Sequence, residues 1–256
     1  MFSLLYVEFS RAFLTLFRYP ANFISHLFIN IFMFYGLFLG ASFMSGRNSF
    51  GDTLDTLVVG YTAWVMVNRT FARTPQSIEA EAATGVLESI FLSRYNTSFV
   101  YMIRGFVEAI IDMAMIIILI NAIIWLTNSN IAWTGFIAFP VLTILFASIG
   151  CSLMAGGFAL QWKRISAILP SIQFVLMFLM FAPFETWYEQ GNLLVMLLPM
   201  VPSVVMMREL MVYDMVFNVD LAIMAMANGV IYLTAGLIIF HKMVMRARNN
   251  GLVGGY

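Results

Sequence analysis

Three ionisable residues, Arg104, Glu108 and Asp112, are spaced four apart inside an otherwise apolar stretch. A helix turns once in about 3.6 residues, so this spacing places all three side chains on one helix face. Charged groups in an apolar segment are costly and are usually paired or functional. Two kinds of chemistry fit: an internal ion pair that faces other helices, or a proton relay or substrate contact.

A second group of acids lies in residues 77–92, a polar segment between two apolar runs. Ser77 is expected to cap a short helix that begins near Ile78, because serine hydroxyls accept from free N–H groups at helix starts. The acidic and apolar side chains of this helix are Glu79, Glu81, Val86, Leu87, Glu88, Ile90 and Phe91. The segment is interpreted either as a simple interfacial turn or as a helix that docks into a groove on a partner.

Other reactive side chains are sparse. Cys151 is the single cysteine, so it forms no intrachain disulfide and is expected to serve in packing. His26 and His241 lie near opposite ends of the chain, and no H-E-x-x-H or paired-cysteine spacing exists. We therefore expect no metal site and no catalytic residues on this chain.

The composition shows that these residues do not belong to an ordinary soluble protein. Of the 256 residues, 62% are hydrophobic and 10% are charged, whereas soluble domains have about 45–50% and about 25%. A soluble protein of this size cannot cover that much apolar surface. The composition excludes an ordinary soluble enzyme, a disordered chain and a nucleic-acid-binding protein.

Continuous apolar runs predict an all-α integral membrane protein, because a bilayer-spanning helix needs about 20 mostly apolar residues. The alternating pattern of a membrane β-barrel is absent from the sequence. We predict six spans in one membrane domain covering residues 1–256. The six spans are Asn22–Met44, Leu54–Thr70, Ser98–Thr127, Trp133–Ala159, Ile165–Ala182 and Leu221–Val244.

Two further elements flank the spans. Residues 1–20 have apolar side chains near helical spacing and polar ones elsewhere, which predicts an amphipathic helix in the membrane interface. Residues 184–215 contain an apolar run that is too short to cross and is interrupted by Pro199 and Pro202. This pattern favours a re-entrant helical hairpin before the last span, with a proline-broken seventh span as the alternative.

Sorting the charges orients the six spans. With both termini in the cytoplasm, only Arg47 and Arg208 of the 13 basic residues fall on the outer side. The basic residues assigned to the cytoplasmic side are Arg11, Arg18, Arg69, Arg73, Arg94, Arg104, Lys163, Arg164, Lys242, Arg246 and Arg248. This asymmetry is the positive-inside signal of multi-pass membrane proteins. It places residues 77–92 in the cytoplasm, where Arg69 and Arg73 are expected to pair with Glu108 or Glu88.

Residues 81–88 read Glu-Ala-Ala-Thr-Gly-Val-Leu-Glu. This segment resembles the E-x-x-x-G-T-L-E motif that ABC type-2 permeases carry just before their third span. Glu81, Gly85, Leu87 and Glu88 match the motif, and Val86 replaces the usual threonine. The chain also lacks the threonine-proline pair that often follows. The interfacial helix, the six spans and the proline-broken element extend the resemblance over nearly the whole chain.

The resemblance implies the membrane subunit of an ATP-driven exporter in a prokaryotic plasma (inner) membrane. Such a subunit pairs with a second permease chain, here expected to be an identical copy, and with two cytoplasmic ATPase subunits. The chain has no G-x-x-x-x-G-K-[ST] loop, so ATP and Mg²⁺ would be held by the partner. The implied cargo is hydrophobic, amphipathic or lipid-linked, with a glycan ranked below a lipid, drug or peptide.

In the resembled family, the second and fifth spans line the subunit interface and the export path. The corresponding candidates here are Tyr61, Trp64, Asn68, Phe174, Met177, Phe178 and Phe181. The alternative for each of them is ordinary core or lipid-facing packing. Two other classes of protein stay open: a stand-alone channel or secondary carrier, and an intramembrane enzyme, for which no G-x-S-x-G elbow is present.

Overall fold

The computed structural model describes residues 2–45, 52–127, 131, 133–162, 165–213 and 215–249. Within these ranges the chain forms helices and no strand, which confirms the all-helical prediction. Arg47, Lys163 and Arg164, used above to orient the chain, lie outside the described residues. The elements are α1 (Phe2–Arg18), α2 (Pro20–Ser45), α3 (Asp52–Ala83), α4 (Val86–Phe91), α5 (Thr97–Thr127), η1 (Gly135–Ile137), α6 (Ala138–Gln161), η2 (Ile165–Ala167), α7 (Leu169–Phe181), α8 (Phe184–Glu189), η3 (Leu193–Leu197), α9 (Val201–Met211) and α10 (Val219–Asn249).

Within the described residues, four helices are long and apolar enough to cross a membrane. These four stretches, Pro20–Gly40, Thr97–Thr127, Gly135–Gln161 and Val219–Asn249, match the predicted first, third, fourth and sixth spans. The predicted second span lies within α3, which is long but carries more polar residues. The predicted fifth span contains α7, which is apolar but has only 13 residues. The chain is therefore compatible with a multi-pass membrane protein, while the count of six spans is not established.

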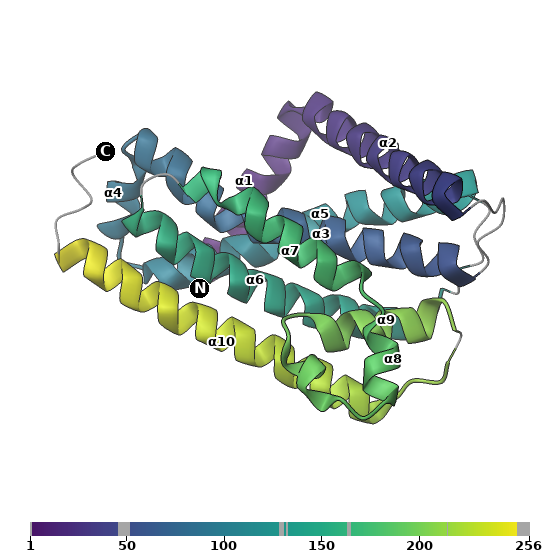
Figure 1. Cartoon of the computed structure of the whole chain (residues 1–256). Helices are drawn as coiled ribbons and strands as arrows, with labels where there is room; N and C mark the ends of the chain where they lie inside the picture. Colours follow the sequence, from purple (N-terminus) through teal and green to yellow (C-terminus); the bar gives the residue numbers. More distant parts are fainter. Residues whose placement is uncertain are drawn as a thin grey trace.

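The long helices run lengthwise beside one another, with α6 packed along α10 and α3 (Figure 1). Glycines permit the closest of these contacts. A Cβ atom on Gly150 would lie 2.2 Å from the carbonyl oxygen of Tyr232, and one on Gly236 would lie 2.3 Å from the carbonyl oxygen of Gly150. Backbones at this separation leave no room for a side chain. These glycines therefore let α6 and α10 pack with their backbones in contact.

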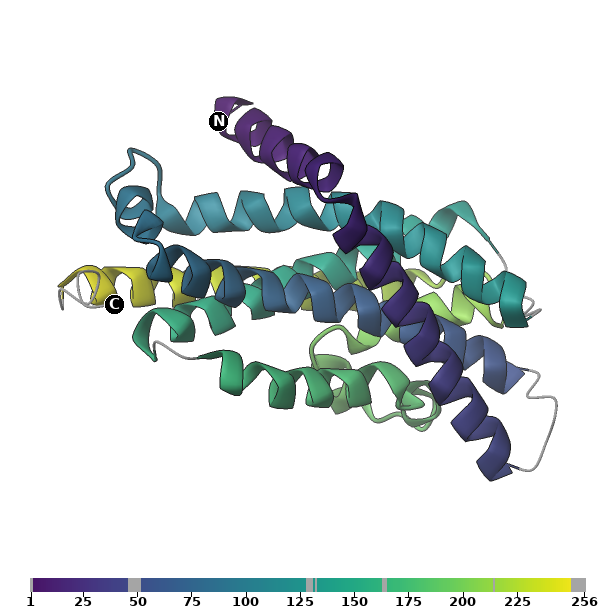
Figure 2. The same ribbon diagram turned by 90° about the horizontal axis from the view of Figure 1, so that it is seen from above.

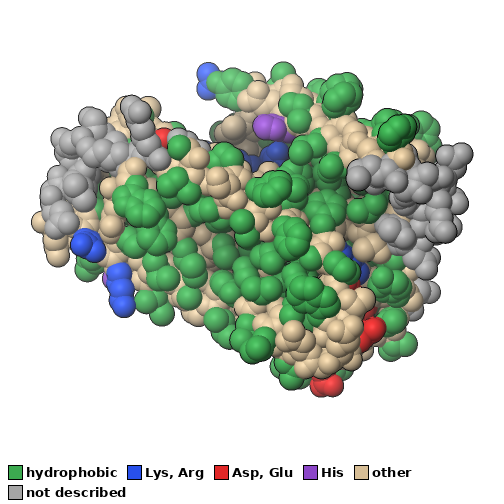
Figure 3. Space-filling view, viewed as in Figure 1, with side chains coloured by type: hydrophobic (Ala, Val, Ile, Leu, Met, Phe, Trp, Pro, Cys, Tyr) green, Lys and Arg blue, Asp and Glu red, His purple; other side chains and the backbone are tan. Residues whose placement is uncertain are grey.

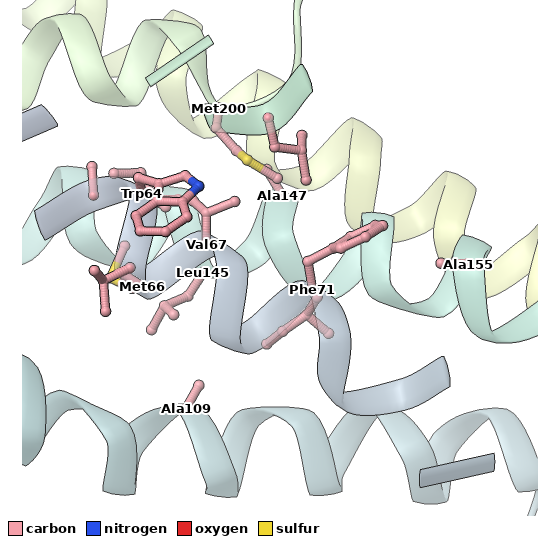
Figure 4. Close-up of a cluster of buried hydrophobic side chains, with 14 of the residues drawn as sticks. Trp64, Met66, Val67, Phe71, Ala109, Leu145, Ala147, Ala155 and Met200 are labelled. Atoms are coloured by element: carbon pink, nitrogen blue, oxygen red, sulfur yellow. The ribbon is translucent and has the colours of Figure 1, made fainter. Parts of the chain in front are cut away.

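The buried core draws large side chains from several helices. Figure 4 shows Trp64, Val67 and Phe71 of α3 near Leu145 of α6, with Met200 close by. All five side chains are buried. The core thus ties α3 to α6, and through Met200 to the turn that precedes α9.

The first two helices lie at the edge of this core, which Phe34 of α2 joins. Figure 2 shows α2 crossing the other helices obliquely, and only 6% of its apolar window is buried. In α1, Phe9, Phe13 and Phe17 are exposed, whereas Glu8 is buried against α5. The polar face of α1 therefore packs on protein and its apolar face points outward, as suits a helix in contact with lipid.

The predicted start of a helix at Ser77 is wrong. The α3 helix continues through Ser77 to Ala83, even though Pro75 lies inside it. Ile78 is fully buried, and the Ser77 hydroxyl donates to the Glu81 carboxylate at 3.2 Å, so both residues hold the last turns of α3 in place. The break comes instead at Gly85, whose φ of 75° lies in the left-handed region that favours glycine. Only Val86–Phe91 forms a separate helix.

Residues 184–213 form short broken helices rather than a seventh span. The longest of them is α9, with 11 residues, and Pro202 lies in its first turn. Met200, just before α9, has a φ of 67°. In Figure 1, α8 and α9 lie near the end of the molecule where α10 begins. The depth of this segment in a membrane stays a prediction.

Candidate functional site

Arg104 is the centre of a polar network that joins three helices. Its side chain is buried on α5. Its Nη1 donates to Oε1 of Glu81 at 2.5 Å and to the Ser77 hydroxyl at 3.1 Å, both on α3. Its Nε donates to Oε2 of Glu8 on α1 at 3.2 Å. A buried guanidinium between two carboxylates is the arrangement that offsets the cost of removing these charges from water.

Tyr101 completes this network one turn earlier on α5. Its hydroxyl donates to the second carboxylate oxygen of Glu81. The Arg104 guanidinium also lies 5.1 Å from the centre of the Tyr101 ring, within the range of a cation–π contact. Glu81, the first residue of the permease-like motif, is therefore held by two side chains of α5.

Glu108 and Asp112 belong to an ion-pair cluster that Arg11 joins to the Arg104 network, since Arg11 also lies 3.5 Å from Glu8. Asp112 accepts from Nη2 of Arg69 at 2.7 Å and from Nη2 of Arg73 at 2.8 Å. Glu108 lies 3.6 Å from guanidinium nitrogens of Arg73 and of Arg11. The expected pairing of Arg73 with Glu108 is confirmed, whereas Arg69 pairs with Asp112. These contacts are those of internal ion pairs, and a proton relay through them stays a prediction.

A cavity of about 310 Å³ opens beside this cluster, between α1, the start of α2, α3 and α5. Its polar lining includes Arg11, His26, Arg69, Arg73, Glu108 and Asp112. Figure 3 shows a hollow that contains basic and histidine side chains within a largely hydrophobic surface. Positive and negative groups are both present in the wall, so the cavity is polar without a strong excess of either charge.

The α4 helix sits at the end of the molecule where α10 finishes (Figures 1 and 2). Leu87 and Phe91 are buried, and Ile90 is half-buried. Arg248 of α10 donates from Nη2 to the Phe91 carbonyl oxygen at 2.8 Å and lies over the Phe91 ring. One side of α4 is therefore fixed to the rest of the protein.

The other side of α4 faces outward. Glu88 is exposed, Val86 is 46% exposed, and Leu92, just after the helix, is 86% exposed. Glu79, on α3, is half-buried. The residues of segment 77–92 thus divide into a buried set and an outward set, which is the arrangement a docking element requires.

The predicted path residues are only partly brought together. Tyr61, Met177, Phe178 and Phe181 line one apolar cavity of about 240 Å³ between α2, α3 and α7. The remaining three candidates, Trp64, Asn68 and Phe174, do not line it. Trp64 is buried in the core and Phe174 is 67% exposed.

Tyr61 also has a structural role at this cavity. Its hydroxyl donates to the Asn30 carbonyl oxygen at 2.7 Å and so connects α3 to α2. Phe34 of α2 packs edge-on against the Tyr61 ring. These two contacts hold the otherwise separate α2 helix against the cavity.

Sequence reasoning assigned Arg208 to the outer side of the membrane and missed its structural role. The side chain is 1% exposed. It donates to the carbonyl oxygens of Met180 at 2.5 Å and Ala182 at 2.9 Å, and to Glu185 Oε1 at 2.8 Å. Carbonyl groups at a helix end have no partner within the helix. Arg208 supplies that partner to α7 and fixes α9 against it.

Asn228 is a second buried polar residue that the sequence analysis missed. Its Nδ2 donates to the carbonyl oxygens of Met196 at 3.0 Å and Leu198 at 2.9 Å, and its Oδ1 accepts from the Met200 N–H at 3.1 Å. The sequence contains one sign of this role, a single amide within the apolar part of α10. Asn228 holds the strained turn at Met200.

The end of the molecule that carries α8 and α9 is acidic. Burial raises the pKa of the Glu209 carboxyl above its usual value, and the negative charges of Glu185 and Glu189 raise it further. Glu185 is paired with Arg208. This acidic end lies opposite the end that carries α4 and the basic last turn of α10.

Among the described residues, no group of three His, Cys, Asp or Glu side chains is placed to hold a metal ion. Comparison of the chain with models of protein families, with curated proteins and with solved structures gives no match. The geometry and the sequence motif therefore carry the functional argument alone.

Proposed function

We propose that this chain is the membrane-spanning permease subunit of an ATP-driven exporter. In this proposal the chain crosses a prokaryotic inner membrane six times, with both termini in the cytoplasm. It is not itself an ATPase: two cytoplasmic partner subunits bind ATP and Mg²⁺. A second copy of the chain completes the membrane core.

The observation that carries the proposal is the position of α4. This short helix is fixed on one side through Leu87 and Phe91, and its other side presents Glu88 outward. It lies at the basic end of the molecule, which the positive-inside rule assigns to the cytoplasm. A helix held firmly from behind can transmit the motion of a partner that grips its exposed side.

The four motif matches have separate physical roles in this proposal. Glu81 connects α3 to α5 through Arg104, and Gly85 supplies the left-handed turn before α4. Leu87 anchors α4 in the core, and Glu88 is left to contact the ATPase. An acidic docking residue would pair with a basic group of the partner.

The proposed cargo is hydrophobic, amphipathic or lipid-linked. Support comes from the apolar cavity between α2, α3 and α7, whose wall includes Tyr61, Met177 and Phe178. Methionine and aromatic side chains form adaptable apolar surfaces that suit varied cargo. The exposed Phe174 and Phe178 of α7 would face the second permease chain or lipid.

The proposal is tested by co-expressing the chain with a candidate ATPase, such as one encoded by a neighbouring gene, and purifying through a tag on the permease. The expected result is a stable complex whose ATP hydrolysis drives transport in proteoliposomes. Glu88→Arg should reduce the amount of bound ATPase about tenfold, because an arginine would repel the basic group of the partner that Glu88 attracts.

The matched control is Glu189→Arg, which makes the same charge reversal at the end of α8, far from α4. It should leave ATPase binding unchanged. Failure of every candidate ATPase to bind, with transport by the permease alone, would instead favour a secondary carrier. Equal losses of bound ATPase in Glu88→Arg and Glu189→Arg would show that α4 is not the docking site.

A further inference from the structure

A second polar pocket, of about 340 Å³, lies between the loop that follows α4 and the last turns of α10. Its lining includes Arg94, Asn96 and Thr97 on one side and His241, Met245 and Arg248 on the other. Arg94 and His241 are exposed. The pocket is separate from the ion-pair cluster on α5 and from the apolar cavity beside α7.

The charge in this pocket is one-sided. Its lining, as far as the structure describes the chain, contains two arginines and a histidine but no carboxylate. Arg94 donates to the Tyr95 hydroxyl, and Arg248 donates to the Phe91 carbonyl oxygen and the Thr97 hydroxyl. A guanidinium has five N–H donors, so both arginines keep donors for an anion.

The backbone adds to this preference. Thr97 is the first residue of α5, and the positive end of a helix dipole favours a negative group. The nearby end of α10 carries Lys242 and Arg246 as well, both exposed. Phosphate groups suit such a site because guanidinium groups bind their oxygens through charge-assisted hydrogen bonds.

The depth of the pocket matches the level of lipid headgroups. The 31 residues of α10 span about 46 Å, close to the roughly 40–45 Å of a bilayer with its headgroups. The last turn of α10, which contains Met245 and Arg248, then lies in the headgroup region of one leaflet, with His241 just below it. Figure 3 shows basic side chains at this end of the molecule, next to a broad hydrophobic surface. The exposed Met245 lines the pocket, and the exposed Ile238 lies about one turn before His241 on α10, where acyl chains would run.

From this geometry we propose that the pocket binds the phosphate headgroup of an anionic phospholipid. In the proposed orientation the lipid belongs to the cytoplasmic leaflet. Arg94 and Arg248 contact the phosphate, and the acyl chains lie along the apolar face of α10. Because Arg248 also holds Phe91, the bound lipid would help to fix α4. The inference needs only the membrane location of the chain and is independent of the export function.

The test is native mass spectrometry of the purified full chain, titrated in detergent with phosphatidylglycerol or with phosphatidylcholine. The expected result is that phosphatidylglycerol binds about tenfold more tightly, because both lipids carry a phosphate but the choline of phosphatidylcholine adds a positive charge that the two arginines repel. Arg94→Glu should reduce this preference to about one. Arg94 is exposed, so the variant should keep its fold, which an unchanged melting temperature would verify.

Arg246→Glu is the matched control, because it makes the same charge change on the same end of α10 but outside the pocket lining. The Arg246→Glu variant should keep at least half of the preference for phosphatidylglycerol over phosphatidylcholine. Equal affinities for the two lipids in the unaltered chain would overturn the proposal, as would equal losses in the two variants. Displacement of phosphatidylglycerol by inorganic phosphate at the same concentration would show a site for free phosphate and overturn the lipid assignment.

Discussion

The Arg104 guanidinium donates a 2.5 Å hydrogen bond to the Glu81 carboxylate, and this contact joins the first turns of α5 to the end of α3. The same guanidinium reaches Glu8 on α1. Since α4 follows Glu81 by only a few residues, a displacement of α4 would act on α5 and α1 through this one cation. The network therefore provides the mechanical link that the proposed coupling role requires.

Replacement of Arg104 tests how much the network contributes to stability. Arg104→Met leaves the half-buried Glu81 without its cation and the buried Glu8 with Arg11 alone, which should cost about 3–5 kcal/mol. For a chain of this size, each kcal/mol lowers the melting temperature by about 2–4 °C. Thermal unfolding in detergent measures the change. Arg246→Met, which removes an exposed cation, should change the melting temperature little, and equal effects would contradict the burial argument.

Arg208 allows a double-mutant test at the opposite end of the molecule. Arg208→Met removes the cation of Glu185 and the donor to the Met180 carbonyl oxygen, whereas the Ala182 oxygen keeps the Phe184 N–H, and the change should cost about 3–5 kcal/mol. In the double variant with Glu185→Met, the unpaired carboxylate is gone, so part of the loss should be recovered. The melting temperatures of Arg208→Met and of the double variant measure the coupling between Arg208 and Glu185. Additive losses would show that the two side chains do not act as a pair.

Gly85 tests the turn between α3 and α4. A Cβ atom here would meet nothing within 4 Å, so Gly85→Ala changes only the backbone preference at a φ of 75°. The left-handed conformation should cost alanine about 1–2 kcal/mol. Gly36→Ala, also in open space but inside α2, should instead stabilise the chain by about 0.5–1 kcal/mol. A melting temperature that rises in both variants would contradict the assigned turn.

Gly236 tests the close contact of α6 and α10. A Cβ atom at this position would lie 2.3 Å from the carbonyl oxygen of Gly150, a backbone atom that cannot move aside alone. Gly236→Ala should therefore separate the two helices and cost about 3 kcal/mol. The melting temperature, compared with that of Gly36→Ala, measures the effect. A stability equal to that of the unaltered chain would show that the helices are less tightly packed than described.

The features that could be predicted from the sequence are those that depend on hydrophobicity or on the geometry of a single helix. Long apolar runs specify membrane-spanning helices by hydrophobicity alone, which is why α2, α5, α6 and α10 fall at predicted spans. The four-residue spacing of Glu108 and Asp112 placed both near one helix face, and Arg73 was correctly expected beside Glu108. These inferences need only local sequence and the geometry of a single helix.

The remaining features depend on contacts between distant segments. The structural role of Arg208 was missed because its partners, the carbonyl oxygens that end α7, carry no sequence signal. Ser77 reads as a helix cap, but the burial of Ile78 and the pairing of Glu81 with Arg104 keep α3 helical beyond it. Tertiary packing overrides local preference in both cases.

The central claim is that the exposed side of α4 contacts an ATPase. A photo-crosslinking amino acid placed at position 88, in cells that express the chain and its ATPase at natural levels, tests it most directly. The account predicts that mass spectrometry identifies at this position a protein with a G-x-x-x-x-G-K-[ST] loop, and that the same probe at the exposed position 190 captures none. Crosslinks to lipid alone at position 88, or equal capture of the ATPase at both positions, would contradict it.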